Sequence, residues 1–235
     1  MGIKENLETV RSEIRETLRG AGRPEDDALF LCVTKLHTAD EINEAIGCGV
    51  TDIGENKVQE LLDKYEKVKP VRWHLIGHLQ TNKVKYIIDK VCMIHSVDSL
   101  KLAKEIDKRA KAAGVCMDIL IQTDPAKQET KFGAAPEDLG ELIGAVKAEC
   151  GNVKVRGLMG IAPFADDPED ARPFFREMKK LYDCFGEEYD GGNVHFDTLS
   201  LGMTNDFRIA LEEGSNLVRI GTAVFGRRDY RSEEK

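Results

Sequence analysis

Lys35 is the first residue of this sequence whose type and position suggest chemistry. It follows the apolar segment 29–33, in the run CVTKLH. Most lysines are solvated surface charges, but a lysine that leaves an apolar strand at the mouth of a barrel is partly desolvated. Desolvation favours the neutral amine, which condenses with an aldehyde to form a Schiff base. Lys35 is therefore our candidate for a covalent link to a carbonyl ligand.

Two later segments, LSLGMTND (199–206) and VRIGTAVFG (218–226), each place a hydroxyl and a glycine where an apolar run ends. Glycine lets backbone N–H groups approach the oxygens of a phosphate, and Ser200 and Thr222 offer hydroxyl donors. The helix expected beyond each glycine adds positive potential. The alternative, that the glycines only make tight strand-to-helix turns, stays open when the segments are taken alone.

Arg219 lies inside the apolar run NLVRI (216–220). An unpaired guanidinium is costly to bury, so Arg219 should face a polar ligand or an acid, with a structural ion pair as the alternative. A Schiff-base lysine, a phosphate cup and an arginine between them together describe a site for pyridoxal 5'-phosphate.

The elements that must position these residues show two hydrophobic periods. Between short apolar segments, the apolar residues recur with the period of a helix, as at 58–65 and 139–146. Eight β-branched, apolar segments are candidate strands: 29–33, 50–53, 71–76, 91–95, 115–122, 153–159, 194–201 and 216–220.

Eight strands with helices between them demand parallel pairing, and eight is the number at which such a sheet closes. A further helix, with Val10, Ile14 and Leu18 on one face, precedes the first strand. We therefore predict a TIM-type (β/α)8 barrel with an extra N-terminal helix, whose active site lies at the C-terminal ends of the strands. The alternative is an open doubly wound sheet, but GCGVTDIG (47–54) has the wrong glycine spacing for its fingerprint and precedes a strand.

The composition indicates one ordinary globular domain spanning residues 1–235. Hydrophobic residues make up 41% of the chain, and no linker divides it. Thirty-four Lys and Arg against 42 Asp and Glu leave a net charge of −8, which disfavours nucleic acid as a partner. No apolar run approaches the roughly 20 residues of a membrane span, and the first residues lack a signal-peptide core. We expect a cytoplasmic protein.

Other residues with chemical potential receive simpler interpretations. His74 and His78 are four positions apart, but a metal site needs three or four ligands, so we predict no metal centre. Ser200 lacks the first glycine of a GxSxG elbow because Thr198 stands there, which disfavours a hydrolase. The six cysteines form no CxxC pair, and we interpret them as reduced core residues: Cys32, Cys48, Cys92, Cys116, Cys150 and Cys184.

The sequence resembles the pyridoxal phosphate homeostasis proteins, the YggS-like family, whose barrel is similar to the N-terminal domain of alanine racemase. The matching segments span nearly the whole chain: VTK (33–35), GENKVQE (54–60), WHLIGHLQTNK (73–83), HSVDS (95–99), KFG (131–133), RGLMGI (156–161), LSLGMTND (199–206) and VRIGTAVFGRRDY (218–230).

The resemblance implies a set of residues for the cofactor. Lys35 would carry it as an internal aldimine, Arg219 would face its pyridine nitrogen, and Asn56 would lie on the cofactor wall. His74, expected near the barrel mouth, would be a cofactor neighbour. The residues implied for the phosphate cup are Ser200, Met203, Thr204, Gly221 and Thr222. Thr34 and Thr204 stand where serine is common in this family, and both keep a hydroxyl.

Cofactor binding does not imply catalysis. Racemisation needs a second acid or base on the opposite face of the substrate carbon, and alanine racemase uses a tyrosine supplied with the help of a second domain. Here 15 residues follow Ile220, Tyr230 lies in a polar tail, and no other tyrosine directly follows a predicted strand. Arg219 also disfavours protonation of the pyridine nitrogen, which makes the ring a weaker electron sink.

We therefore predict a protein that binds pyridoxal 5'-phosphate without being an enzyme and takes part in intracellular vitamin B6 homeostasis and supply. Its expected partners are the cofactor and the apo-enzymes that need it, and a monomer is expected. The alternative is an amino-acid racemase of modest activity that uses Lys35 and an unidentified base.

Overall fold

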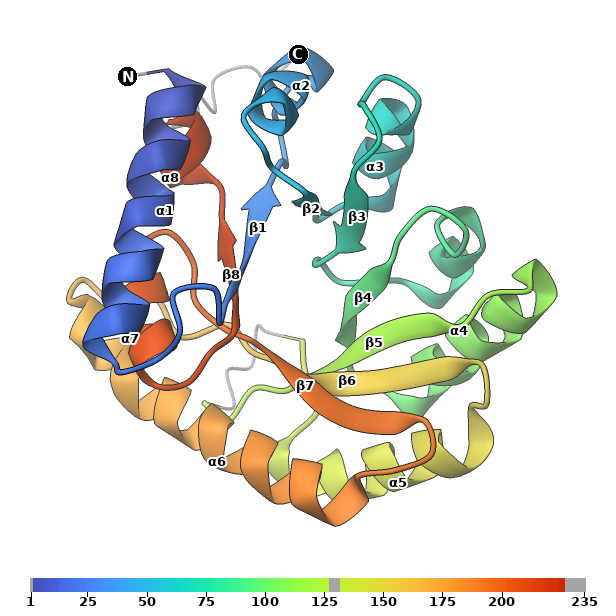
Figure 1. The fold of residues 1–235 in the computed structure, drawn as a ribbon. Helices are drawn as coiled ribbons and strands as arrows, with labels where there is room; N and C mark the ends of the chain where they lie inside the picture. Colours follow the sequence, from blue (N-terminus) through green and yellow to red (C-terminus); the bar gives the residue numbers. More distant parts are fainter. Residues whose placement is uncertain (1, 127–131, 227–235) are drawn as a thin grey trace.

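The computed structural model describes residues 2–126 and 132–226. Eight parallel strands close into a barrel in chain order, and helices surround it (Figure 1), which confirms the predicted (β/α)8 architecture. The strands are β1 (Leu29–Val33), β2 (Asp52–Glu55), β3 (Arg72–Leu75), β4 (Met93–Val97), β5 (Met117–Gln122), β6 (Val153–Met159), β7 (Val194–Ser200) and β8 (Leu217–Ile220).

The connections between strands carry α-helices and short 3-10 helices. The α-helices are α1 (Ile3–Gly20), α2 (Ala39–Gly47), α3 (Val58–Tyr65), α4 (Leu100–Ala113), α5 (Leu139–Glu149), α6 (Arg172–Tyr189), α7 (Phe207–Glu212) and α8 (Thr222–Phe225). The 3-10 helices are η1 (Thr81–Tyr86), η2 (Pro136–Asp138) and η3 (Pro168–Ala171). Among the described residues, no helix is both long and apolar enough to span a lipid bilayer.

Helix α1 covers the side of the barrel where the last strand meets the first. It buries Leu7 together with the predicted stripe of Val10, Ile14 and Leu18, and it packs against α2, α7 and α8 (Figure 1). Helix α8 has only four residues, too few to shield two strands. The extra N-terminal helix therefore completes the outer ring of helices.

The buried apolar residues form two clusters. The larger lies between the strands and the helices and includes Ile53, Trp73 and Val155. The smaller lies inside the barrel and consists of Met93, Leu120 and Met159. The interior also holds buried polar side chains, each less than 5% exposed: Asp52, His74, His95, Ser200 and Arg219. The barrel is thus filled partly by hydrogen-bonded groups.

The cysteines only partly follow the expectation of core residues. All six are free thiols, and Cys32 and Cys150 are buried as predicted. The expectation is wrong for Cys116 and Cys184, which are exposed. Both stand next to apolar residues in the sequence, but Cys116 precedes β5 and Cys184 lies on the outer face of α6.

A buried ionic cluster fixes the loop after β1. The ammonium of Lys64, on α3, donates to Oε1 of Glu55 at 2.8 Å and to Oε1 of Glu60 at 2.6 Å. It also donates to the backbone oxygen of Thr34 at 2.9 Å, and the Thr34 hydroxyl donates to Oε1 of Glu55 at 2.7 Å. Helix α3 therefore holds the end of β1 through charged hydrogen bonds.

The same cluster holds the residue on the other side of Lys35. Leu36 has a φ of 64°, the one positive value among the described non-glycine residues, and a side chain in this region is strained. Its backbone N–H donates to the carboxylate of Glu60. Since Thr34 and Leu36 are both tied to α3, the position of Lys35 is set by that helix.

We expect Lys64→Met to lower the free energy of unfolding by about 3–5 kcal/mol at pH 8, because it leaves the carboxylate of Glu55 buried without its cation. Burial already raises the pKa of Glu55, against the opposing charge and hydrogen bond of Lys64. Without Lys64 the pKa should rise further. The loss should therefore shrink as the pH falls toward 5 and Glu55 takes up a proton.

Urea denaturation at pH 5 and pH 8 measures this effect. Lys69→Met, which replaces an exposed lysine, is the matched control and should change stability little at either pH. Equal losses in the two variants, or a loss in Lys64→Met that does not depend on pH, would contradict the role given to the cluster.

Candidate cofactor site

Lys35 lies at the C-terminal end of the barrel, directly beyond β1 and Thr34. Its side chain is half-buried, and its Nζ forms no hydrogen bond or ion pair with any residue that the structure describes. Lys64, by contrast, is buried and committed to Glu55 and Glu60. Of these two lysines, Lys35 is the one whose amine is available to a ligand.

The glycines of the two predicted phosphate segments differ in role. Gly202 has a φ of 86°, and a Cβ there would lie 2.7 Å from the Cβ of Ala210 and 2.9 Å from the Cα of Phe207. Gly202 therefore makes a tight turn under α7, as the structural alternative proposed. Gly221 has a φ of −123°, which any residue adopts. Its φ does not by itself require glycine, and the absence of a side chain suits the close approach of a ligand.

The loop after β7 and the start of α8 lie side by side. Thr204 and Ala223 line one hollow of about 390 Å³. Met203 is 39% exposed, and its backbone N–H donates to Oδ1 of Asp206 at 2.6 Å. The first N–H groups of α8 have no acceptor within their own helix. The structure thus places Thr204 and Ala223 at one hollow, with Met203 next to Thr204 in the sequence and with Gly221 and Thr222 directly before Ala223.

Arg219 points into the barrel interior. One of its terminal nitrogens donates to the backbone oxygen of Ser200 at 2.7 Å and to the Ser200 hydroxyl at 2.6 Å. The other donates to the backbone oxygen of Gly160 at 2.7 Å. Burial lowers the pKa of Arg219 to about 10, so it stays charged at neutral pH. A guanidinium has five N–H donors, and two are left for a ligand.

Ser200 is fully buried, at the end of β7. Its Oγ accepts from Arg219 and lies 3.3 Å from Nδ1 of His95, on β4. The predicted phosphate hydroxyl is therefore also the link between Arg219 and a histidine of the barrel interior.

The expectation that His74 lies near the barrel mouth is wrong. It is fully buried inside the barrel, with Nε2 3.0 Å from Oδ1 of Asp52, the first residue of β2, and Nδ1 3.0 Å from Nε2 of His95. The residue that reaches the mouth after β3 is His78, whose ring stacks on that of Phe132 with 3.7 Å between the ring centroids. His74 contacts other interior side chains and is shielded from a ligand at the mouth.

Asn56 directly follows β2, at the C-terminal end of the barrel strands. Its Oδ1 is buried and has no hydrogen-bond partner among the described residues. Its backbone packs closely against Gly77, where a Cβ would lie 2.2 Å from the Asn56 oxygen. An unsatisfied buried acceptor is costly. A ligand with a donor would satisfy it, so the rim here suits a polar cofactor.

The sequence reasoning did not single out His95, Asp52, Glu55 or Lys64. Asp52 and His95 each lie in a predicted strand segment, 50–53 and 91–95, whose other residues are apolar or β-branched, which is the signal that marked Arg219 as unusual. Applied to every strand, that rule would have found them. No comparable signal marks Lys64, because a lysine on an amphipathic helix is ordinarily solvated.

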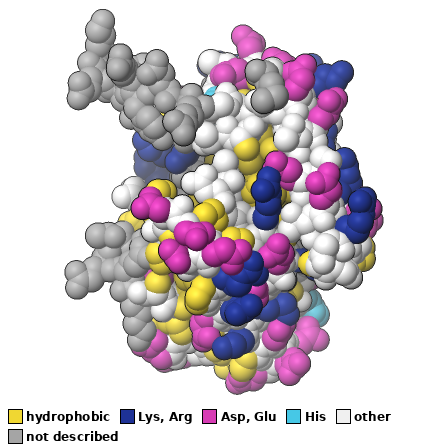
Figure 2. Space-filling view, turned by 90° about the vertical axis from the view of Figure 1, so that its left-hand side faces the viewer, with side chains coloured by type: hydrophobic (Ala, Val, Ile, Leu, Met, Phe, Trp, Pro, Cys, Tyr) yellow, Lys and Arg dark blue, Asp and Glu magenta, His cyan; other side chains and the backbone are white. Residues whose placement is uncertain are grey.

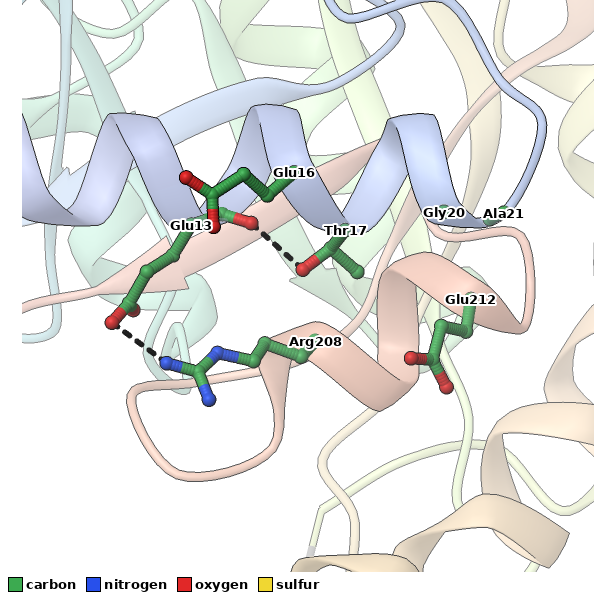
Figure 3. A pocket seen from close by; sticks show the side chains of 7 residues that line it. All are labelled: Glu13, Glu16, Thr17, Gly20, Ala21, Arg208 and Glu212. Atoms are coloured by element: carbon green, nitrogen blue, oxygen red, sulfur yellow. Dashed lines mark hydrogen bonds and ion pairs between the residues drawn. The ribbon is translucent and has the colours of Figure 1, made fainter.

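A second hollow, of about 630 Å³, lies between α1 and α7 (Figure 3). It is lined by Glu13, Glu16 and Glu212, and the guanidinium of Arg208 is already paired with Glu13 at 2.7 Å. Three carboxylates repel a phosphate. Acidic and basic side chains are interspersed on this face of the molecule (Figure 2). The barrel mouth is therefore the better candidate for an anionic cofactor.

Comparisons with known proteins identify the family of the chain. Residues 5–229 match the family described as alanine racemase, N-terminal domain. A pyridoxal phosphate homeostasis protein of Aquifex aeolicus is 46% identical over 232 residues, which cover 98% of this chain and 100% of that protein.

Solved structures extend the likeness. PipY of Synechococcus elongatus with PLP bound has a TM-score of 0.82 and 30% identity, covering 95% of this chain and 100% of that one. An alanine racemase of Clostridium difficile shares the fold alone, with a TM-score of 0.73 and 17% identity over 99% of this chain and 58% of that one. The chain belongs to the family of the alanine racemase N-terminal domain and, within it, to the pyridoxal phosphate homeostasis proteins.

Proposed function

We propose that this protein binds pyridoxal 5'-phosphate at the barrel mouth and takes part in vitamin B6 homeostasis. The single observation that carries the proposal is Lys35, a half-buried amine without a partner among the described residues, on a loop clamped by Glu55, Glu60 and Lys64. The names of the curated relatives, and the solved PipY structure with PLP bound, support the same cofactor.

Lys35 is proposed to bond to the cofactor through a Schiff base, formed by its amine and the aldehyde carbon with loss of water. The cofactor supplies this aldehyde together with a phosphate group and a pyridine ring. The clamped loop would hold Nζ in one place, which reduces the entropy lost on binding.

The phosphate is proposed to lie against the loop after β7 and the start of α8. Gly221 allows close approach, Thr222 and Thr204 offer hydroxyls, and Met203 lines the cup. Ser200, below the cup, would contribute its hydroxyl while it also accepts from Arg219. Asn56, on the opposite wall, would accept a hydrogen bond from the cofactor through its unsatisfied Oδ1.

Arg219 is proposed to face the pyridine nitrogen with its two remaining N–H groups. A permanent cation there disfavours protonation of the ring, so the ring withdraws electrons weakly. None of the four described tyrosines lies at a strand end. These are Tyr65, Tyr86, Tyr182 and Tyr189; Tyr230 lies outside the described residues. Both features favour binding over racemisation.

We further propose that the chain acts as one domain and as a monomer in the cytoplasm, and that apo-enzymes requiring the cofactor receive it. A binding protein with reversible covalent attachment would keep the aldehyde from stray amines until it is passed on.

The first expectation is that Lys35→Ala abolishes the visible absorbance band that forms when the purified protein is incubated with pyridoxal 5'-phosphate. Borohydride should fix the cofactor on the Lys35 peptide of the natural protein, as seen by peptide mapping. Lys85→Ala, a change at an exposed lysine, should behave like the natural protein. Labelling of another lysine, or an undiminished band in Lys35→Ala, would refute the assignment.

The phosphate cup is tested by Thr222→Val. A hydrogen bond to a charged oxygen contributes about 1.5–3 kcal/mol, so pyridoxal 5'-phosphate should bind roughly ten-fold more weakly or worse. Binding of unphosphorylated pyridoxal should hardly change. Thr198→Val, on β7 with its hydroxyl bonded to Asp197, is the control. If both ligands weaken equally, Thr222 supports the fold instead of the phosphate.

The non-enzymatic role is tested in heavy water. We expect the loaded protein to exchange the α-hydrogen of common amino acids no faster than free pyridoxal 5'-phosphate does, since the ring is a weak electron sink and no described tyrosine lies at a strand end to act as a second base. Proton NMR of alanine follows the exchange. Fast exchange that disappears in Lys35→Ala would establish carbanion chemistry and favour the racemase alternative.

A further inference from the structure

Five buried polar side chains form one hydrogen-bonded chain through the barrel interior. Asp52 Oδ1 lies 3.0 Å from His74 Nε2, and His74 Nδ1 lies 3.0 Å from His95 Nε2. His95 Nδ1 lies 3.3 Å from the Ser200 hydroxyl, which is 2.6 Å from Arg219. These residues come from β2, β3, β4, β7 and β8, and none is more than 4% exposed.

The two residues at the ends of this hydrogen-bonded series, Asp52 and Arg219, have fixed roles as acceptor and donor. Burial would raise the pKa of Asp52, but hydrogen bonds from His74 and Thr51 lower it below the ordinary value, so Asp52 is an ionised acceptor. His74 therefore carries a proton on Nε2. At the other end Arg219 only donates, so the oxygen of Ser200 accepts from it.

Between the ends, two proton arrangements satisfy every contact. When His74 is neutral, its Nδ1 accepts from Nε2–H of His95, and Nδ1 of His95 then accepts from the hydroxyl of Ser200. The proton of Ser200 is directed at His95 and is unavailable to any other group.

When His74 is an imidazolium, both bonds reverse. Nδ1–H of His74 donates to Nε2 of His95, and Nδ1–H of His95 donates to the oxygen of Ser200. That oxygen now accepts from His95 and from Arg219, so its own proton is free to point away from both. The acceptor that it would meet at the mouth is the phosphate.

We propose that a proton on His74, deep inside the barrel, switches the Ser200 hydroxyl from His95 to the phosphate of the bound ligand. His74 and His95 are then positioning residues for phosphate recognition. This inference rests on the proposed function, because it takes pyridoxal 5'-phosphate as the ligand.

The switch balances as a proton relay. The proton on Nε2 of His95 passes to Nδ1 of His74, and the proton of the Ser200 hydroxyl passes to Nδ1 of His95. The Ser200 oxygen takes one proton from the mouth, supplied by water, so the net change is the uptake of a single proton. No proton has to cross the apolar layer between strands and helices.

The surroundings favour His74 as the holder of that proton. Burial lowers the pKa of His74, but the hydrogen bonds to Asp52 and Cys92 outweigh it, so the pKa lies above the ordinary 6.5. Burial lowers the pKa of His95 well below 6.5, and the charges of His74 and Arg219 lower it further. A cationic His74 beside a neutral His95 is the arrangement that these shifts support.

Other charged groups act on His74 through its partners. Arg72, on β3, lies 3.3 Å from Asp52 and shares its carboxylate. Asp118, on β5, acts in turn on Arg72 and pairs with Arg156 at 2.8 Å. Asp118 and Arg156 compensate each other, and Asp52, although it also pairs with Arg72, is the anion in direct contact with His74.

The relay predicts that the contribution of the phosphate group to the binding affinity depends on pH. As the pH rises through the pKa of His74, above 6.5, the Ser200 hydroxyl turns to His95 and the phosphate loses one donor. The ratio of the affinity for pyridoxal 5'-phosphate to that for pyridoxal should then fall about ten-fold, the effect of one charged hydrogen bond. The phosphate's own second pKa is about 6, so the phosphate is mostly a dianion across this range.

The affinities for both ligands should be measured between pH 6.5 and 9.5 in phosphate-free buffer. Their ratio cancels the pH dependence of the Schiff base, which both ligands form. We expect the ratio to fall in the natural protein, to be flat in Ser200→Ala, and to fall at a lower pH in Asp52→Asn, which removes the anion that keeps His74 charged. The control His195→Gln changes a histidine exposed on β7 and should keep the natural profile.

Nitrogen-15 NMR of the natural protein provides a test that needs no variant. With pyridoxal 5'-phosphate bound near neutral pH, both ring nitrogens of His74 should carry protons, and His95 should be protonated on Nδ1 only. Raising the pH should move the proton of His95 to Nε2 as His74 becomes neutral. A His95 protonated on Nε2 throughout would overturn the relay, even if Asp52→Asn fails to fold.

Failure of the relay and failure of the proposed function give different results. If neither ligand produces the Lys35 absorbance band, the proposed function is wrong. If both ligands bind and their affinity ratio is independent of pH in the natural protein, the function stands and the relay is wrong. A ratio that falls identically in Ser200→Ala would also overturn the relay.

Discussion

Pairing between β1 and β8 is the contact on which the candidate site depends. Their hydrogen-bonded register sets Leu31 beside Arg219 and Cys32 beside Ile220. The first and the last strand of the sequence therefore pair with each other, and the sheet has no open edge. When this register is continued beyond the ends of both strands, the loop of Lys35 lies next to the start of α8. Lys35 and the residues proposed to hold the phosphate, which are far apart in the sequence, thereby become neighbours.

Strand β2 connects the two buried polar systems. Successive side chains of a strand point to opposite faces, so Asp52 turns into the barrel toward His74 while Glu55 turns out toward Lys64. The inner contact begins the chain that ends at Arg219, and the outer one clamps the loop of Lys35. Four residues therefore support the site from both sides of the sheet, and a shift of β2 by one residue would break both contacts.

The charge distribution explains why an overall acidic protein suits an anionic ligand. The net charge is −8, yet the barrel interior holds Arg219, whose opposing carboxylate, Asp206, acts on it without a direct contact. Burial raises the pKa of Asp206, which further weakens the compensation. A phosphate at the rim would supply the missing negative charge where the local dielectric makes it most effective.

Much of this arrangement could be read from the sequence, because hydrophobic periods report whether a side chain faces the core. They placed the eight strands, the stripe of α1 and Lys35 at a strand end, and one cation in an apolar run identified Arg219. Depth along the barrel axis and pairing between elements could not be read in this way. The position of His74 inside the barrel and the contact of Ser200 with His95 depend on inter-strand register, and the choice of Lys64 as partner of Glu55 depends on how α3 packs against β2. That register shifts between β4 and β7, and only hydrogen bonds between distant segments determine it.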